Sequence, residues 1–294
     1  MKNAKLLIMK QLILTICISV ALFSCKKSTE EMIDANAEKI MIDVAYATTS
    51  TQQKMDVYLP ANRSTSSTHT VIMIHGGSWS GGDKADFNND IPNLKPLLGN
   101  YAIINLNYRL ANGSTILLPQ QLADIDDAFT FIHSKATEYN INTSKIAVMG
   151  ASAGAHLTLL KSYKNNSDGK IKAVVNLFGP TDMAWMYNNH PMASLTQPII
   201  VNAVGGTPTT NAAAYTSGSP INFVTATVPP TIIFHGTADL VVPISESNNL
   251  QSKLQLAGAT HQYITYTGEA HGWSGANLVD TYNKAVAFIK NYVK

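Results

Sequence analysis

The feature that most constrains the fold is an alternation, from residue 42 onward, between short β-branched apolar runs and longer segments of helical periodicity. Runs that are apolar at nearly every position are typical of strands buried on both faces of a sheet. The strand candidates lie at 70–74, 102–106, 145–149, 173–178, 231–234 and, more weakly, 262–266. Because strands joined by crossover helices form parallel sheets, the pattern predicts an α/β fold, a mostly parallel sheet of about eight strands flanked by helices.

Other segments extend this prediction at both ends of the sheet. Residues 41–47 and 54–59 are expected to form an antiparallel pair that leads into it. Amphipathic helices are expected at 119–132, 245–256 and 278–293. Residues 179–230 are rich in Asn, Pro, Thr and Met and lack strong periodicity. Because this segment is too long for a simple connection, we interpret it as an insertion over the carboxyl edge of the sheet.

A serine lies between two glycines at the end of one strand candidate. Gly150-Ala151-Ser152-Ala153-Gly154 follows 145–149 directly and precedes an apolar run at 156–160. In a sharp strand-to-helix turn a serine adopts a strained backbone that exposes its hydroxyl, and small residues are needed two positions before and after it. We therefore predict that Ser152 is a nucleophile and that the N–H of Ala153 points at a developing oxyanion. A structural turn is the alternative.

A second glycine-rich loop, His75-Gly76-Gly77-Ser78-Trp79, follows the strand candidate at 70–74. It resembles the His-Gly-Gly-Gly-Trp motif of α/β-hydrolase esterases, particularly the branch with hormone-sensitive-lipase-like enzymes and acetyl-xylan or feruloyl esterases. The resemblance implies that the N–H groups of Gly77 and Ser78 join that of Ala153 in an oxyanion hole. The chain departs from the motif at Ser78, where the family often has a third glycine. The resemblance also implies a structural role for the imidazole of His75.

The acid and the base are expected in two later loops. His235-Gly236-Thr237-Ala238-Asp239 follows the strand candidate at 231–234, and it resembles the acid loop of the same family. Asp239 would orient the base, and Asp182, which follows the preceding strand candidate, is the rival acid. His271 lies in a glycine-rich loop after 262–266 and is the expected base. The order Ser152, Asp239, His271 is the chain order of this superfamily.

The resemblance runs from about residue 42 to the end of the chain and implies a function. It implies a carboxylic ester hydrolase that forms an acyl-serine intermediate and removes acetyl or feruloyl groups from plant polysaccharide. An amide hydrolase of the kynurenine formamidase type and a non-catalytic surface binding module are the alternatives. The candidates for lining the substrate pocket are Trp79, Trp185, Met186, Tyr187 and Trp273, and ordinary packing is the alternative for each of them.

The N-terminus has the features of an export signal. Three lysines precede an apolar run at 12–23, which is short for a membrane-spanning helix. The end of the run, Leu22-Phe23-Ser24-Cys25, resembles the lipobox of bacterial lipoproteins, in which the cysteine carries the lipid. A plain signal peptide with an incidental cysteine is the alternative.

These features divide the chain into three parts. We expect 1–24 to be a lipoprotein signal peptide, 25–41 a tether and 42–294 the α/β-hydrolase catalytic domain. The protein is then exported and anchored to a membrane through a lipid on Cys25, facing the periplasm or the cell surface.

Composition narrows the possible chemistry and partners. The only two cysteines are Cys17 and Cys25, so a mature domain without the signal would have no disulfide, no cysteine nucleophile and no Cys-ligated zinc. The eight histidines show no metal-ligand spacing, and we expect neither a metal nor a cofactor. Because 21 Lys and Arg are nearly balanced by 19 Asp and Glu, we expect no nucleic-acid partner.

Overall fold

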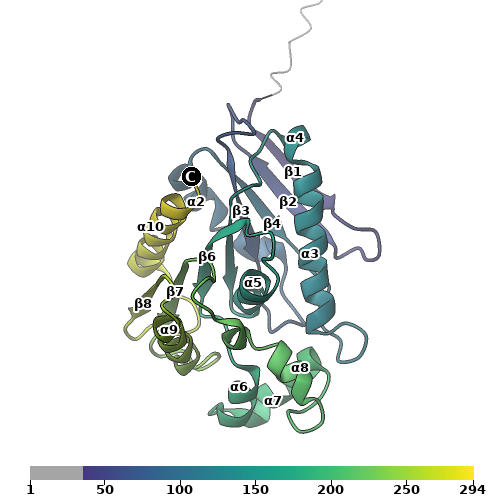
Figure 1. The fold of residues 1–294 in the computed structure, drawn as a ribbon, viewed down its shortest axis with the longest axis vertical. Helices are drawn as coiled ribbons and strands as arrows, with labels where there is room; N and C mark the ends of the chain where they lie inside the picture. Colours follow the sequence, from purple (N-terminus) through teal and green to yellow (C-terminus); the bar gives the residue numbers. More distant parts are fainter. Residues whose placement is uncertain (1–35) are drawn as a thin grey trace, which may run out of the picture. The chain divides into compact units, whose positions relative to one another are not determined.

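A computed structural model describes residues 36–294, which form one eight-stranded sheet flanked by helices (Figure 1). The strand order is β1-β2-β4-β3-β5-β6-β7-β8, antiparallel from β1 to β4 and parallel from there on. The strands are β1 (Lys39–Ala45), β2 (Lys54–Leu59), β3 (His69–Ile74), β4 (Tyr101–Leu106), β5 (Ile146–Ala151), β6 (Ile171–Leu177), β7 (Thr231–Gly236) and β8 (His261–Tyr266). The predicted fold class is confirmed.

The antiparallel lead-in begins earlier than its sequence pattern indicates. Lys39 pairs with Leu59, so β1 starts inside the segment 25–41 that we interpret as a tether. The register shifts between Met41 and Val44, and Asp43 there has a φ of 58° while its N–H donates to Asp56 at 2.9 Å. Such an irregularity in the strand pairing disrupts the alternation of apolar and polar side chains, so the sequence pattern does not show where the strand begins.

The predictions for the signal peptide, for Cys25 and for most of the tether concern residues outside the described part of the chain. Within residues 36–294, no helix has the length and apolar character needed to cross a membrane.

The two faces of the sheet bury separate apolar clusters. Alternate residues of β3 point to opposite faces, with Val71 and Met73 in one cluster and Ile72 and Ile74 in the other. The helices are α2 (Ile91–Leu98), α3 (Leu118–Ser134), α4 (Ala136–Tyr139), α5 (Ala153–Lys164), α6 (Met183–Asn189), α7 (Ala193–Val204), α8 (Ala212–Ser217), α9 (Ser245–Ala257) and α10 (Gly275–Tyr292), with 3₁₀ turns η1 (Lys84–Phe87) and η2 (Pro220–Phe223). Helices α2 and α10 cover the face of Val71, and α3, α5 and α9 cover the other face (Figure 1).

The segment 179–230 contains α6, α7, α8 and η2, which the sequence pattern does not predict. The helices are short, and α7 contains Pro198, so apolar periodicity has little length in which to develop. The segment lies at the carboxyl edge of the sheet, as expected. Asn202 donates to the carbonyl of Ala111 after β4, and His190 bonds the carbonyl of Val241 after β7. Figure 1 shows α6, α7 and α8 grouped beside each other.

Candidate active site

The turn from β5 into α5 places Ser152 at the carboxyl edge of the sheet. Ser152 has a φ of 53°, which is a strained conformation for a residue with a side chain. A Cβ added at Gly150 would lie 2.4 Å from the carbonyl oxygen of Gly154. One added at Gly154 would lie 2.1 Å from the carbonyl oxygen of Ile74. The requirement for glycine at both positions is therefore confirmed, and it comes from backbone in contact with backbone.

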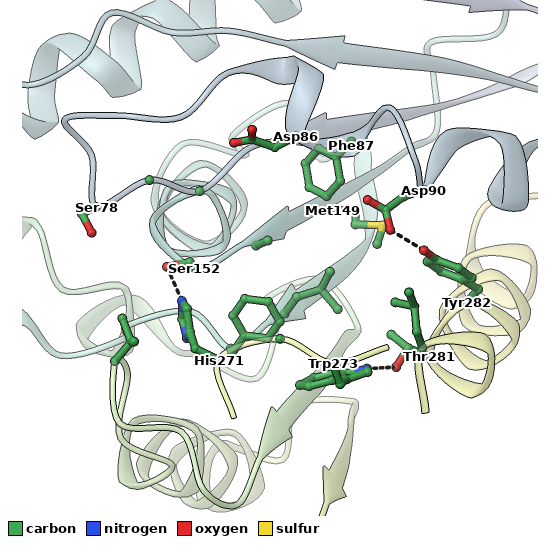
Figure 2. Close-up of a pocket in the computed structure, with 18 residues that line it drawn as sticks. Ser78, Asp86, Phe87, Asp90, Met149, Ser152, His271, Trp273, Thr281 and Tyr282 are labelled. Atoms are coloured by element: carbon green, nitrogen blue, oxygen red, sulfur yellow. Dashed lines mark hydrogen bonds between the residues drawn. The ribbon is translucent and has the colours of Figure 1, made fainter. Parts of the chain in front are cut away.

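Ser152, His271 and Asp239 form a continuous hydrogen-bonded chain (Figure 2 shows its Ser152–His271 link). His271 follows β8, and its Nε2 lies 2.9 Å from the Oγ of Ser152. Its Nδ1 lies 2.7 Å from the Oδ2 of Asp239, which follows β7. Because a carboxylate only accepts, Nδ1 carries the proton and Nε2 is free to accept from the serine hydroxyl. The structure thus brings together three residues that are 32 and 119 positions apart.

Asp239 is held as a carboxylate by four polar contacts. Its Oδ1 accepts from the N–H groups of Val241 at 2.8 Å and Val242 at 2.9 Å. Burial acts to raise the pKa of Asp239, but contacts with His235 and His271 and with the Val242 N–H outweigh it. The pKa of Asp239 therefore lies well below its usual range, and its charge faces the base.

Asp182, the rival acid, occupies a different position. It is the N-cap of α6, where its carboxylate accepts from the N–H of Trp185 at 2.9 Å. The N–H of Asp182 itself donates to Glu246 at 2.8 Å. The structure therefore places Asp239, and not Asp182, against His271.

The loop after β3 lies directly beside the nucleophile. A Cβ added at Gly76 would lie 3.1 Å from the Cβ of Ser152, so the loop backbone passes the serine at contact distance. Gly77, Ser78 and Trp79 have φ values of 107°, 54° and 62°. These three successive residues are in the left-handed region. The predicted donors Gly77 and Ser78 line the same pocket as Ser152, and Ala153 follows Ser152 as the first residue of α5.

Hydrogen bonds hold this loop in its strained form. His75 bonds the carbonyl of Gly76 through Nδ1 at 2.7 Å and stacks on Tyr108, and burial lowers its pKa. This geometry agrees with a structural imidazole. The indole N–H of Trp79 donates to Nδ1 of His156 at 3.1 Å, and burial lowers the pKa of His156 to about 4. The contact between Trp79 and His156 has no local sequence signal, because the two residues are 77 positions apart.

A pocket of about 400 Å³ adjoins Ser152 (Figure 2). Phe178 contacts the ring of His271 edge-on, with 4.6 Å between ring centroids. Farther in, Asp90 and Tyr282 are hydrogen-bonded to each other. The remaining side chains of the pocket include Phe87, Met149, Leu177, Trp273 and Leu278.

Of the five side chains predicted to line the pocket, only Trp273 does so. Trp79 and Met186 are buried in the core on the opposite face of the sheet from Trp273. Trp185 and Tyr187 lie on α6, which does not contribute to this pocket. The prediction was wrong for these four because a residue type alone does not indicate which way a loop or a helix turns its side chains.

Within residues 36–294, no group of three or more His, Cys, Asp or Glu side chains has the arrangement of a metal site.

The solved structures that resemble this fold include two with sequence identities above one quarter. A truncated carbohydrate esterase from gut microbiota is 27% identical, with a TM-score of 0.70 over 86% of this chain and 98% of that chain. The bifunctional GH43-CE protein of Bacteroides eggerthii is 26% identical, with a TM-score of 0.76 over 89% of this chain and 36% of that chain.

Sequence relatives named as ester hydrolases match a smaller part of this chain. A probable carboxylic ester hydrolase, LipM of Mycobacterium tuberculosis, is 25% identical over 226 residues, which are 72% of this chain and 51% of LipM. The chain thus spans about half the length of this curated relative.

A family match covers most of the sheet. Residues 55–254 match the BD-FAE family, from β2 into α9. This region holds Ser152 and Asp239 together with the loop after β3, and it ends before His271. Since the match covers more than half of the chain, the protein belongs to the BD-FAE family.

Proposed function

We propose that this protein is a carboxylic ester hydrolase with Ser152 as its nucleophile. The observation that carries the proposal is the hydrogen-bonded chain Ser152–His271–Asp239 at the edge of a ligand-sized pocket. The names of the relatives, which include esterases and a carboxylic ester hydrolase, support the same reaction class.

The proposed reaction begins with attack of the Ser152 Oγ on the ester carbonyl carbon while His271 Nε2 takes the hydroxyl proton. Asp239 stabilises the resulting imidazolium. The N–H groups of Gly77, Ser78 and Ala153 would stabilise the negative charge on the former carbonyl oxygen. The C–O bond to the alcohol then breaks, and the alcohol leaves with the proton from His271.

The second half of the reaction releases the acid. His271 removes a proton from water, which attacks the acyl-serine carbonyl carbon. The bond between this carbon and the Ser152 Oγ breaks, and the serine recovers its proton from His271. The products are one carboxylic acid and one alcohol, and the enzyme is unchanged.

The pocket supports a bulky acyl group on a carbohydrate as the substrate. A volume of about 400 Å³ walled by aromatic rings exceeds the needs of an acetyl group and suits a flat aromatic acid such as a feruloyl group. The similar solved structure that is named a carbohydrate esterase favours a carbohydrate as the alcohol. We therefore propose acetyl or feruloyl esters of plant polysaccharide, with the feruloyl ester preferred.

A substrate panel with active-site labelling tests the reaction. The wild-type protein should react with a fluorophosphonate probe and turn over nitrophenyl esters, methyl ferulate or acetylated xylan. Ser152→Ala should lose both the label and turnover while keeping the wild-type circular dichroism spectrum. No turnover on any ester, together with an unlabelled Ser152, would refute the proposal, and turnover of N-formylkynurenine alone would instead indicate an amide hydrolase.

The aromatic wall gives a sharper test of the acyl group. Trp273 donates from its indole to Thr281 at 2.8 Å, which holds its ring in the wall. Trp273→Ala should lower kcat/KM roughly tenfold for methyl ferulate and much less for nitrophenyl acetate. Trp185→Ala removes a tryptophan outside the pocket and is the matched control. Equal losses on both esters would contradict an aromatic acyl site.

We also propose that the protein is exported and anchored to a membrane through a lipid on Cys25. The lipobox-like sequence before Cys25 supports this. In a bacterial host supplied with radiolabelled palmitate, the wild-type chain should become labelled and Cys25→Ala should not, because the sulfur that carries the lipid is gone. An unlabelled wild type, or equal labelling of the variant, would overturn the lipid anchor.

A further inference from the structure

A second histidine shares the carboxylate of Asp239. The Nε2 of His235 lies 3.3 Å from Oδ2, the oxygen that also bonds His271, and neither the His235 nor the Asp239 side chain is exposed. His235 is in β7, so its backbone is held by the sheet. It does not line the pocket and therefore has no route to touch a substrate there.

The hydrogen-bond partners of His235 determine which nitrogen carries its proton. Its Nε2 lies 2.8 Å from the carbonyl oxygen of Val242, which can only accept. Nε2 is therefore protonated. Its Nδ1 lies 2.6 Å from the Oγ of Ser247 on α9, and a neutral imidazole accepts from that hydroxyl. His235 thus presents a fixed N–H, with its positive end toward the acid loop.

We propose that His235 is a positioning residue of the hydrolase. It anchors the acid loop and weakens the attraction of the Asp239 carboxylate for the Nδ1 proton of His271. This inference rests on the proposed function, since it assigns a partner to the acid of that mechanism. An N–H dipole beside Oδ2 stabilises negative charge on the carboxylate. A better stabilised carboxylate attracts the Nδ1 proton of His271 less strongly, which makes Nε2 less basic. The Nε2 of His271 therefore gives the proton that it took from Ser152 more readily to the leaving alcohol.

Two further titratable side chains pack around the acid loop. His190 bonds the carbonyl of Val241, and Glu246, next to Ser247 on α9, accepts from the backbone of Thr181 and Asp182. Neither side chain is hydrogen-bonded or ion-paired to the Asp239 carboxylate, whose partners within residues 36–294 are His235, His271 and two backbone N–H groups. Glu246→Gln is therefore a suitable control, because it changes a titratable side chain near the acid loop that does not contact the Asp239 carboxylate.

Two amide substitutions at position 235 separate the two contacts of the imidazole. His235→Gln places its amide N–H near the former Nε2 and keeps a donor for Val242 and Asp239. His235→Asn is shorter and reaches only toward Ser247. The readout is the pH profile of kcat and of KM for nitrophenyl acetate, with thermal unfolding to check that each variant is folded.

His235→Asn should lower kcat roughly tenfold at unchanged KM, because the acid loop loses its anchor. It should also move the acid limb of the kcat profile to higher pH by about half a unit, because the carboxylate loses a donor. His235→Gln should restore the wild-type position of the limb, and Glu246→Gln should not move it. A folded His235→Asn variant with the wild-type acid limb, or a Gln variant shifted as far as Asn, would overturn the proposal.

An independent measurement on the wild-type protein remains decisive if the variants do not fold. In ¹⁵N-labelled protein, the imidazole of His235 should be the tautomer with a protonated Nε2 and an unprotonated Nδ1. The tautomer with the proton on Nδ1 would refute the assignment. Absence of ester turnover by the wild type would instead refute the proposed function, which separates the two failures.

Discussion

At the residue scale, what an aspartate can do depends on the donors that surround it. Asp182 and Asp239 both follow a strand at the carboxyl edge of the sheet. The carboxylate of Asp182 accepts from a backbone N–H in the first turn of α6. One carboxylate oxygen of Asp239 instead bonds His271, and the other accepts from two backbone N–H groups. Only the second arrangement fixes the tautomer of a histidine that faces Ser152.

This difference predicts unequal effects of the same substitution. Asp239→Asn should lower kcat by about 10³–10⁴, because an amide no longer selects the Nδ1–H tautomer of His271 or stabilises the imidazolium. Asp182→Asn should retain most activity, because Asn also caps helices well. Steady-state kinetics on one nitrophenyl ester compares the two variants. Comparable losses would transfer the role of the acid to Asp182.

At the scale of elements, the turn between β5 and α5 is built by close backbone packing. Gly154 is in the first turn of α5, and α5 approaches β3 so closely there that no side chain fits. This approach presses the start of the helix against the loop after β3. The nucleophile and the loop beside it are therefore positioned by the same backbone contact.

Gly154→Ala should therefore damage both stability and activity. The new methyl would lie 2.1 Å from the carbonyl oxygen of Ile74 and 2.2 Å from that of His75, so α5 must move away from β3. Overpacking of this kind costs roughly 1–3 kcal/mol in the free energy of unfolding, which urea denaturation measures. Gly258→Ala is a useful comparison, since its added methyl meets nothing within 4 Å and only its φ of 71° opposes the change. If Gly154→Ala destabilises less than Gly258→Ala, close packing is not what requires Gly154.

At the scale of the whole molecule, a buried carboxyl joins α9 to the segment 179–230. Oε2 of Glu246 accepts from the N–H of Thr181 at 2.6 Å and from that of Asp182 at 2.8 Å. Its Oε1 has no hydrogen-bond partner among the described residues. Burial raises the pKa of Glu246 to about 7, despite the hydrogen bonds that act to lower it.

The raised pKa predicts how stability depends on pH. Between the ordinary value of 4.5 and about 7 the folded protein holds a proton on Glu246 that the unfolded chain has lost. The contribution of this group is therefore complete below pH 4.5 and is lost as pH rises through about 7, by up to about 3 kcal/mol. Asp239 acts in another window, since its lowered pKa makes its contribution fall only as pH drops below its ordinary 3.8.

Urea denaturation of the wild type and of Glu246→Gln from pH 4.5 to pH 8 tests this dependence. The free energy of unfolding of the wild type should fall with rising pH over this range, and that of the variant should fall less. Parallel curves for the two proteins would show that Glu246 does not hold its proton in the folded state.

The sequence by itself determined those features that depend on near neighbours along the chain. The apolar runs that form the strands, the glycines around Ser152 and the loop after β3 are local features of the chain, so they can be recognised as sequence patterns. The candidate at 145–149 is β5 (Ile146–Ala151), for example, because a strand buried on both faces must be apolar throughout. Asp239 could be proposed because its loop resembles the acid loop of α/β-hydrolase esterases, and His271 because it alone of the eight histidines lies in the expected place, after the last strand candidate.

Only the tertiary structure decided the features made by residues far apart in sequence. Asp90 and Tyr282 meet in the pocket across 192 positions, and Trp79 meets His156 instead of a substrate. The short helices of 179–230 and the second histidine on Asp239 likewise depend on what packs against them. A side chain's burial and partners are set by contacts between elements, which no window of neighbouring residues contains.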